Sequence, residues 1–290
     1  MDPMMGARQA DEEGGSADLQ PGEYTAHTQV TQQAFVYAIG QVQPRFPSLG
    51  VEKEFAQVAG QRATATSATD RQIFRETLSD PGNRYLARQL CWVFMIGGLE
   101  SYLLMPRDRA DFDLLVEAVR SSPEPTDLDV VVGKAGPLSQ PEACGLIVPI
   151  VAFDQLYSFD RSSLLGAIPK PENATGKKLS LFRATSAELF DRIMQLADNA
   201  GNTDEHRALN YLAVRYPDIY TQTAIAHEEN ASLDAVDVRL SRLSGVRKVL
   251  DVIFSYRNRR TDVVHKYFVR VDVTEEFPFL VTKLSPFYDR

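Results

Sequence analysis

Alternating side chains near the carboxyl end of the chain place the strongest constraint on its fold. From Val263 to Val273 the odd positions are Val, His, Tyr, Val, Val and Val, whereas the even positions are mostly polar. Since successive side chains of a strand point to opposite faces, this pattern predicts a half-buried antiparallel strand. Further strand-like runs lie at residues 235–240, 246–256 and 279–284. Together these runs predict an antiparallel β-meander.

Helices are predicted immediately before this meander. After Ser186, apolar residues cover more than one face of a helix, which implies burial on two sides. Thr203 followed by Asp and Glu is typical of a helix start, and Pro217 suits the start of a third helix. Residues 185–290 are therefore predicted to form a domain of three helices and an antiparallel sheet.

Strands and helices are mixed over residues 33–167. Thr69 and Gln72 have the spacing of a capping box, in which each side chain bonds to the other's backbone N–H. Gly97-Gly98 supplies the positive φ of a tight hairpin between two apolar runs. The other predicted elements are strands at 34–42, 128–132 and 146–153 and helices at 48–60, 84–90 and 108–120. The predicted fold class is thus α+β, with a mixed α/β first domain.

Two segments are predicted to lie outside these domains. Residues 1–30 hold six acidic side chains and one basic side chain, and no aromatic residue precedes Tyr24. Such a segment buries too little apolar surface to offset the entropy of ordering, so we expect a disordered acidic tail. Residues 168–184 are rich in Pro, Lys, Asn and Gly without an apolar period, which predicts a linker.

Composition and charge argue against several classes of function. The net charge is -8, and phosphate binding needs a strong basic excess over some face, so no nucleic-acid partner is expected. No apolar run reaches the ~20 residues that span a bilayer, and no signal peptide is visible, so no membrane partner is expected. Two cysteines are too few for a disulfide framework or a four-thiolate zinc site, and a cytoplasmic location is expected.

Common catalytic motifs are absent from the sequence, but two clusters of charged residues are candidates for binding. The first cluster, at the start of a predicted helix, consists of Glu205, His206 and Arg207. Acidic residues also favour helix starts on electrostatic grounds, so this cluster has a purely structural explanation too. The second cluster, at a predicted hairpin tip, consists of Arg257, Arg259 and Arg260. In an acidic chain, such a basic tip would suit the N-terminal tail or an acidic peptide.

A metal-dependent site is an alternative that sequence separation neither supports nor excludes. Catalytic zinc sites often use three protein ligands, which Cys91, Cys144 and His206 would supply. However, both cysteines lie in or beside predicted buried strands, and free cysteine is among the most buried residue types. No cofactor is therefore expected, and zinc bound by these three residues is the alternative.

Five longer stretches are more distinctive than any short motif. They are VYAIGQVQPRFPS (36–48), NRYLARQLCW (83–92), FDRIMQLADN (190–199), TDEHRALNYLAVRYP (203–217) and VRVDVTEEFPFLV (269–281). Through them the chain resembles the C-terminal domain of the cyanobactin maturation proteins PatA and PatG, from about residue 33 to its end. In that family this region has no assigned activity. Proteolysis and macrocyclisation belong to subtilisin-like domains that precede it, and since no such segment is seen in this sequence, neither activity is expected.

The resemblance implies an accessory role. We expect a standalone, non-catalytic module in the biosynthesis of ribosomally made, modified peptides. Its expected partners are a precursor peptide or the enzymes that process it, and a homodimer is expected. The alternative is a peptide-modifying or metal-dependent enzyme with a site around His206, Cys91 and Cys144.

Overall fold

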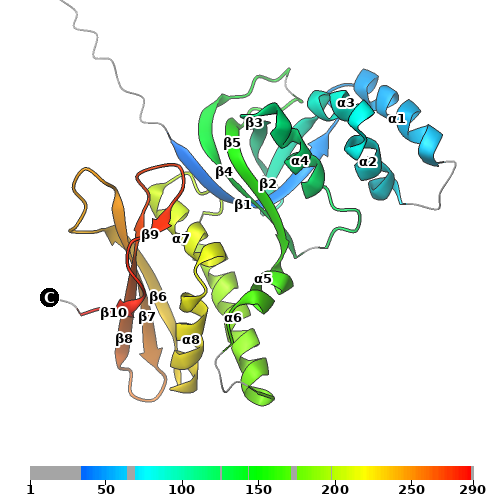
Figure 1. Ribbon diagram of the computed structural model, residues 1–290. Coiled ribbons are helices and arrows are strands. Elements are labelled where there is room, and N and C mark those ends of the chain that lie inside the picture. Colours follow the sequence, from blue (N-terminus) through cyan, green and yellow to red (C-terminus); the bar gives the residue numbers. More distant parts are fainter. Residues whose placement is uncertain are drawn as a thin grey trace, which may run out of the picture. The chain divides into compact units, whose positions relative to one another are not determined.

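A computed structural model describes residues 34–63, 69–124, 126–142, 144–170, 175–196 and 198–288, without the side chains of residues 61–63 (Figure 1). The predicted acidic tail, residues 1–30, lies outside the described residues. Residues 33–290 form one compact unit. Its first half is a barrel with helices, and its second half is a helical layer on an antiparallel sheet, so the α+β class is confirmed.

Five strands of the first half close into a barrel. They are β1 (Phe35–Arg45), β2 (Cys91–Ile96), β3 (Leu99–Pro106), β4 (Asp127–Leu138) and β5 (Pro149–Asp160). The order around the barrel is β1-β2-β3-β5-β4, and β1 and β4 close it. Neighbouring strands are antiparallel except β3 and β5, which are parallel. With α4 (Phe112–Ala118) between β3 and β4, this is the strand order of an OB-fold barrel, a fold that by itself assigns no activity.

The barrel interior is filled by large apolar side chains. Trp92, Phe94 and Phe153 are each at most 1 % exposed, and Trp92 Nε1 donates to the carbonyl oxygen of Ala87 at 2.9 Å. Between β1 and β2 the chain forms α1 (Leu49–Ala63), α2 (Asp70–Ser79), the 3-10 turn η1 (Pro81–Asn83) and α3 (Arg84–Gln89). The predicted capping box at the start of α2 is present, as is the hairpin at Gly97-Gly98.

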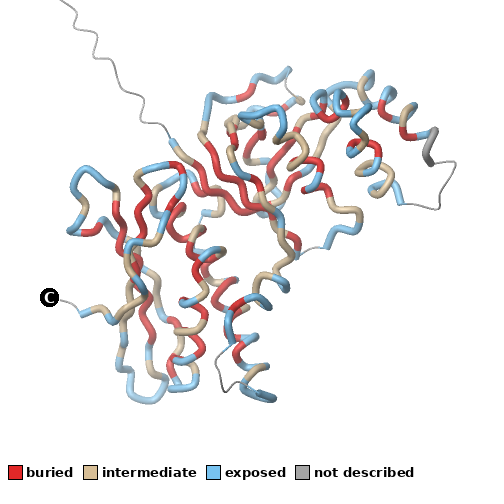
Figure 2. Tube along the Cα trace, in the orientation of Figure 1, coloured by how far each residue is buried: buried red, intermediate tan, exposed pale blue. Residues whose placement is uncertain are grey.

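The second half packs helices against one face of a sheet. Its helices are α6 (Lys177–Leu196), α7 (Asp204–Arg215) and α8 (Asp218–Glu228), and its strands are β6 (Ala231–Leu240), β7 (Val249–Asn258), β8 (Val264–Asp272), β9 (Phe279–Leu280) and β10 (Ser285–Pro286). The sheet order is β10-β8-β7-β6, with β9 also pairing to β8. Buried residues line the helix sides that face the sheet (Figure 2). The predicted meander is therefore confirmed, as are the three helices before it.

The connection between the halves is shorter than the predicted linker. The 3-10 turn η2 (Arg109–Asp111) precedes α4, α5 (Arg161–Ala167) follows β5, and α6 already begins at Lys177. Residues 177–184 are thus helical, because Leu179 and Phe182 pack into the core of the second half. Leu179 and Phe182 stand in a Pro- and Lys-rich stretch without an apolar period, so the composition of residues 168–184 predicted a linker where a helix begins. The division into two domains stays a prediction.

Backbone contacts join the barrel to the helices. The N–H of Ile39 donates to the carbonyl oxygen of Asn199 at 2.9 Å, and Asn210 Nδ2 donates to that of Tyr37 at 2.8 Å. The outer face of β1 and β4 also packs on Met194, Tyr211 and Val214 of α6 and α7. The two halves share a continuous buried contact.

Candidate functional site

Arg207, one of the predicted binding residues, is buried inside the fold. It is 1 % exposed, and its guanidinium donates to the backbone carbonyls of Val273, Glu275 and Glu276. It also pairs with Asp204 at 3.1 Å and lies 5.1 Å from the centre of the Phe35 ring. Burial lowers its pKa, against the opposing effect of Asp204. Arg207 therefore fastens α7 to the segment after β8 and is not accessible to a ligand.

Glu205 and His206 lie beside Arg207 in the first turn of α7, where Glu205 is exposed and His206 is half-buried. The backbone N–H of His206 donates to Thr203 Oγ1 at 3.2 Å, so Thr203 caps the helix as predicted. This hydrogen bond accounts for the start of the helix. Whether Glu205 and His206 bind a ligand stays a prediction.

The predicted basic tip lies in the β7–β8 hairpin. Arg257, Arg259 and Arg260 are all exposed there. Arg257 pairs with Asp234 at 2.8 Å, and this pair raises the pKa of Arg257 and lowers that of Asp234. Arg259 lines a small hollow with His227. One of the three arginines is thus partnered within the chain, and the binding role of the tip stays a prediction.

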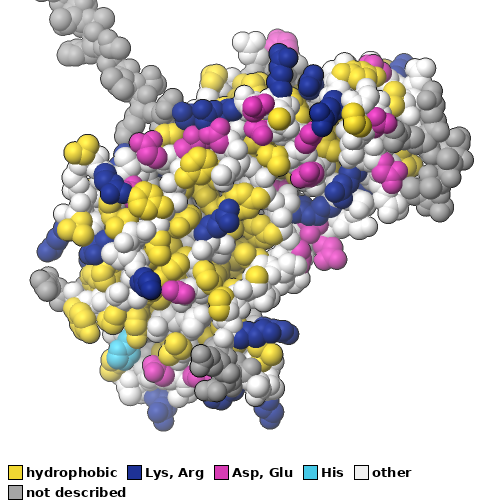
Figure 3. Space-filling model, in the orientation of Figure 1, with side chains coloured by type: hydrophobic (Ala, Val, Ile, Leu, Met, Phe, Trp, Pro, Cys, Tyr) yellow, Lys and Arg dark blue, Asp and Glu magenta, His cyan; other side chains and the backbone are white. Residues whose placement is uncertain are grey.

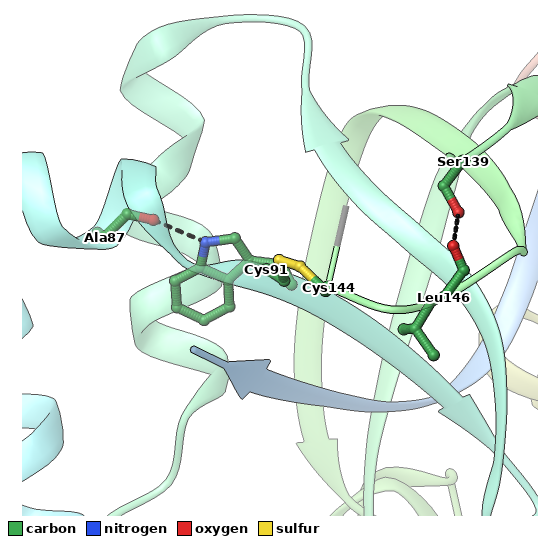
Figure 4. Close-up of a disulfide and its surroundings, with 6 residues drawn as sticks. Ala87, Cys91, Ser139, Cys144 and Leu146 are labelled. Carbon is green, nitrogen blue, oxygen red and sulfur yellow. Dashed lines mark hydrogen bonds between the residues drawn. A yellow bond between two sulfur atoms is a disulfide. The ribbon is translucent and has the colours of Figure 1, made fainter. Parts of the chain in front are cut away.

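The two cysteines are joined in a disulfide (Figure 4). Their Cα atoms are 6.3 Å apart, within the usual range for such a bond. This corrects the expectation of separate buried thiols, which rested on the apolar sequences around each cysteine. A disulfide offers no thiolate to a metal. Among the described residues, no group of three His, Cys, Asp or Glu side chains could hold a metal ion.

A buried carboxylate at one end of the barrel accepts hydrogen bonds from three groups of the chain. Asp129 is 0 % exposed, and burial raises its pKa. Its oxygens accept from the Val42 N–H at 2.7 Å, from Ser158 Oγ at 2.5 Å and from Arg120 Nη2 at 3.1 Å. These three donors hold the barrel end together, and Asp129 also lines a hollow of about 240 Å³ with Arg120 and Asp127.

A hollow that could bind a ligand lies on the outer face of the second sheet. A groove of about 480 Å³ is lined by Arg239, Leu240, Arg242, Asp251, Arg270, Phe287 and Tyr288, which we call the arginine groove. Three basic side chains and one acidic side chain give it a positive charge in an otherwise acidic chain. The register explains this grouping, because Arg239 lies opposite Asp251 and Asp251 lies opposite Arg270.

Aromatic rings order two of these arginines. The Arg239 guanidinium lies 4.7 Å from the Phe287 ring centre, and Arg270 lies 4.7 Å from the Phe268 ring centre. The two rings meet edge to face at 5.6 Å. Stacked guanidinium groups keep their N–H edges free for hydrogen bonding. The result is a pair of contacting rings with one guanidinium on each, beside the groove.

The three arginines differ in their partners. Arg270 Nε donates to Asp251 Oδ1 at 2.9 Å. Within the described part of the chain, neither Arg239 nor Arg242 has an ion-pair partner. Guanidinium groups bind carboxylates through paired, charge-assisted hydrogen bonds. Arg239 and Arg242 are thus the side chains best placed to take an acidic ligand.

Strand β6, which carries Arg239, is the edge strand of its sheet. An edge strand presents unpaired backbone groups that an extended peptide pairs with in β-augmentation. Sequence analysis missed Arg239, Arg242 and Arg270 because they are far apart in the chain. Their only signal was that Arg270 occupies a polar, outward position in the alternation of β8.

The surface elsewhere is mixed. Hydrophobic side chains gather across the middle of the face drawn in Figure 3, while basic and acidic side chains are interspersed over the barrel. Phe277, Phe279 and Val281 are each at least 41 % exposed. No helix in the described ranges is long and apolar enough to cross a membrane.

Comparisons with known proteins place this fold. The family model described as PatG C-terminal matches residues 176–287. A solved structure titled "PatG Domain of Unknown Function" superposes with a TM-score of 0.70 at 19 % identity, covering 88 % of this chain and 98 % of that one. No curated protein matches the sequence. Residues 176–287 therefore belong to the PatG C-terminal family, and the chain has the fold of the PatG domain of unknown function.

Proposed function

We propose that this chain is a non-catalytic docking module in cyanobactin-like peptide biosynthesis. Its arginine groove holds an acidic, extended segment of a precursor peptide or of a processing enzyme. The observation that carries this proposal is the pair Arg239 and Arg242, two arginines without an ion-pair partner in the described part of the chain, beside the edge strand β6. The groove lies within residues 176–287 apart from Tyr288, that is, within the segment matched by the family.

The chemistry of the groove favours a peptide over a small metabolite. One wall carries Phe287 and Tyr288, and Tyr288 is 78 % exposed, so an apolar or aromatic residue next to a carboxylate has a surface to contact. Arg239 and Leu240 of the lining belong to the edge strand β6, whose backbone would fix the direction of an added strand. Carboxylate recognition and strand pairing act together only on an extended acidic peptide.

The proposal also covers the location, the oligomeric state and the partners of the chain. The module works in the cytoplasm as a homodimer, without nucleic acid or membrane, alongside the enzymes of the pathway. The exposed apolar residues Phe277, Phe279 and Val281 are consistent with a second contact surface beyond the groove. Light scattering of the purified chain tests the dimer, since a monomer at micromolar concentration would contradict it.

The test of docking is a binding titration. Dye-labelled precursor peptide and each pathway enzyme are titrated with the chain, and the dissociation constant is measured in low and high salt. The double variant Arg239→Ala/Arg242→Ala should weaken binding at least tenfold, because each lost carboxylate contact contributes about 1 kcal/mol or more. Binding should also weaken with added salt.

A matched control shows whether binding depends on the groove arginines themselves or only on the net charge of the chain. Arg259→Ala/Arg260→Ala removes the same charge from the hairpin tip of β7 and β8, at the other end of β7 from the groove. It should leave the dissociation constant within twofold. If the groove variant binds as tightly as the unmodified chain, or the tip variant loses as much affinity, the arginine groove is not the docking site.

A further inference from the structure

The loop between β4 and β5 folds back over the outside of the barrel. We call its described residues, 139–142 and 144–148, the strap. Leu146 of the strap is only 7 % exposed, and it packs on Val93 of β2 and Leu103 of β3. Cys91, Met95 and Ile150 surround this small cluster. The strap therefore covers part of the outer face of β2 and β3.

This outer face is apolar although it lies outside the barrel core. In β2, Trp92 and Phe94 point into the barrel, so Val93 between them points outward. In β3, Leu103 is outward in the same way, between Tyr102 and Leu104. Outward residues of a solvated barrel strand are usually polar. Val93 is nevertheless 1 % exposed, and the strap's Leu146 is the contact that lies on it.

The disulfide and apolar packing tie the strap to the barrel, and hydrogen bonds inside the strap fix its shape. The Cys91–Cys144 disulfide ties it to the first residue of β2 (Figure 4). Ser139 Oγ donates to the carbonyl oxygen of Leu146 at 2.8 Å and accepts from the Val148 N–H at 3.1 Å. Leu146 supplies the apolar anchor. Only the disulfide links the strap covalently to another strand.

The strap turns through two residues with positive φ. Cys144 has a φ of 65°, in the left-handed region that disfavours residues with a side chain, and Gly145 follows with a φ of 70°. Apart from the disulfide, Leu146 and the half-buried Val148 are the strap residues that pack on the barrel strands, while Leu138 and Ile147 beside them are exposed. The disulfide thus adds a covalent tie to a strap that otherwise rests on the barrel through a few apolar side chains.

We infer that the Cys91–Cys144 disulfide is a redox lock on the strap. A protein dithiol of the thioredoxin class attacks one sulfur, and after exchange the donor holds the disulfide while Cys91 and Cys144 each hold a thiol. Two electrons and two protons pass from the donor to this chain. Both cysteines are half-buried rather than enclosed, so the bond is within reach of such a donor. Reduction frees the strap and uncovers Val93 and Leu103.

The device is independent of the arginine groove, because it lies on the barrel and the groove lies on the second sheet. In a reducing cytoplasm a disulfide is transient or redox-sensing rather than structural. Oxidation would therefore close the strap over the strand face, and the return to reducing conditions would open it. A redox-controlled cover over an apolar strand face is the arrangement that these contacts describe.

Hydrogen exchange followed by mass spectrometry tests the lock on the full chain. Oxidised protein is compared with protein reduced by thioredoxin or by a phosphine, and thiol alkylation confirms each state. We expect exchange in peptides covering residues 139–148 to accelerate at least tenfold on reduction. Binding of a hydrophobic dye should rise at least twofold as Val93 and Leu103 are uncovered.

Two controls make the outcome decisive. Peptides covering the first half of β1, Phe35–Gly40, which pairs with β4, should exchange at an unchanged rate, showing that the fold survives reduction. The variant Cys91→Ala/Cys144→Ala should behave as reduced protein and ignore the reductant. If the reduced strap keeps the exchange protection of the oxidised form, or if air-exposed protein carries two free thiols, the lock does not exist.

Discussion

The backbone N–H of Tyr37 donates to the carbonyl oxygen of Gly201 at 3.0 Å, and position 201 tolerates no side chain against this strand. A Cβ on Gly201 would lie 1.9 Å from the Tyr37 carbonyl oxygen. The φ of Gly201 is also +56°, in the left-handed region. The close approach of one glycine to β1 thus sets how near the barrel lies to the turn before α7.

The substitution Gly201→Ala should be severely destabilising. The new methyl group meets backbone rather than a flexible side chain, so the turn must move away from β1, at a cost of about 2 kcal/mol or more. Urea unfolding measures the loss. Gly98→Ala is the control, because Gly98 has a φ of +83° but nothing within 4 Å of its Cβ position, and should cost only about 1 kcal/mol. Equal losses for the two variants would rule out the close contact.

Arg207 should be essential for stability. In Arg207→Met the carbonyls of Val273, Glu275 and Glu276 lose their buried donor, and we expect a loss of about 3 kcal/mol in the free energy of unfolding. Arg260→Met, at an exposed position, should change stability by less than about 0.5 kcal/mol. A small loss for Arg207→Met, measured by the same urea titration, would show that its contacts are not maintained in solution.

The prediction for Asp129 concerns the stability of the fold and not catalysis. Asp129→Asn replaces an oxygen acceptor by an N–H donor among three donors, from Val42, Ser158 and Arg120. We expect a loss of about 2 kcal/mol in thermal or urea unfolding. Ser158→Ala removes only one of these donors and should cost less. Unchanged stability in Asp129→Asn would indicate that the carboxylate is not held as the structure shows.

Local signals in the sequence predicted the elements that depend on a few neighbouring residues. The capping box of Thr69 and Gln72, the cap at Thr203 and the turn at Gly97-Gly98 are all present, because each is decided within about four residues. The alternation around Val263–Val273 likewise gave β8, since one buried face fixes the phase of a strand.

Contacts between distant segments could not be predicted in this way. Closure of the barrel depends on Phe35 pairing with Lys134, and no local pattern encodes that register. Arg207 looks like a surface charge in its first helical turn, but its carbonyl partners lie 66 to 69 residues further on. The arginine groove arises for the same reason, because Arg239 and Arg270 approach only through β7, which lies between their strands.

Glu276 should make stability depend on pH near neutrality. Burial, and then the neighbouring Asp154 carboxylate, raise its pKa to about 7, against the opposing effect of Arg107 and Lys134. The folded chain therefore keeps a proton on Glu276 that the unfolded chain, with a pKa near 4.5, releases earlier. This contribution is fully present below pH 4.5 and is lost as the pH rises to about 7, at no more than about 1.4 kcal/mol per pH unit. Urea unfolding between pH 5 and pH 8 should show this slope in the unmodified chain. The control Glu275→Gln, at the exposed neighbouring position, should show the same slope. In Glu276→Gln, which mimics the protonated form, the free energy of unfolding should depend less on pH, and an unchanged slope would assign the titration to another group.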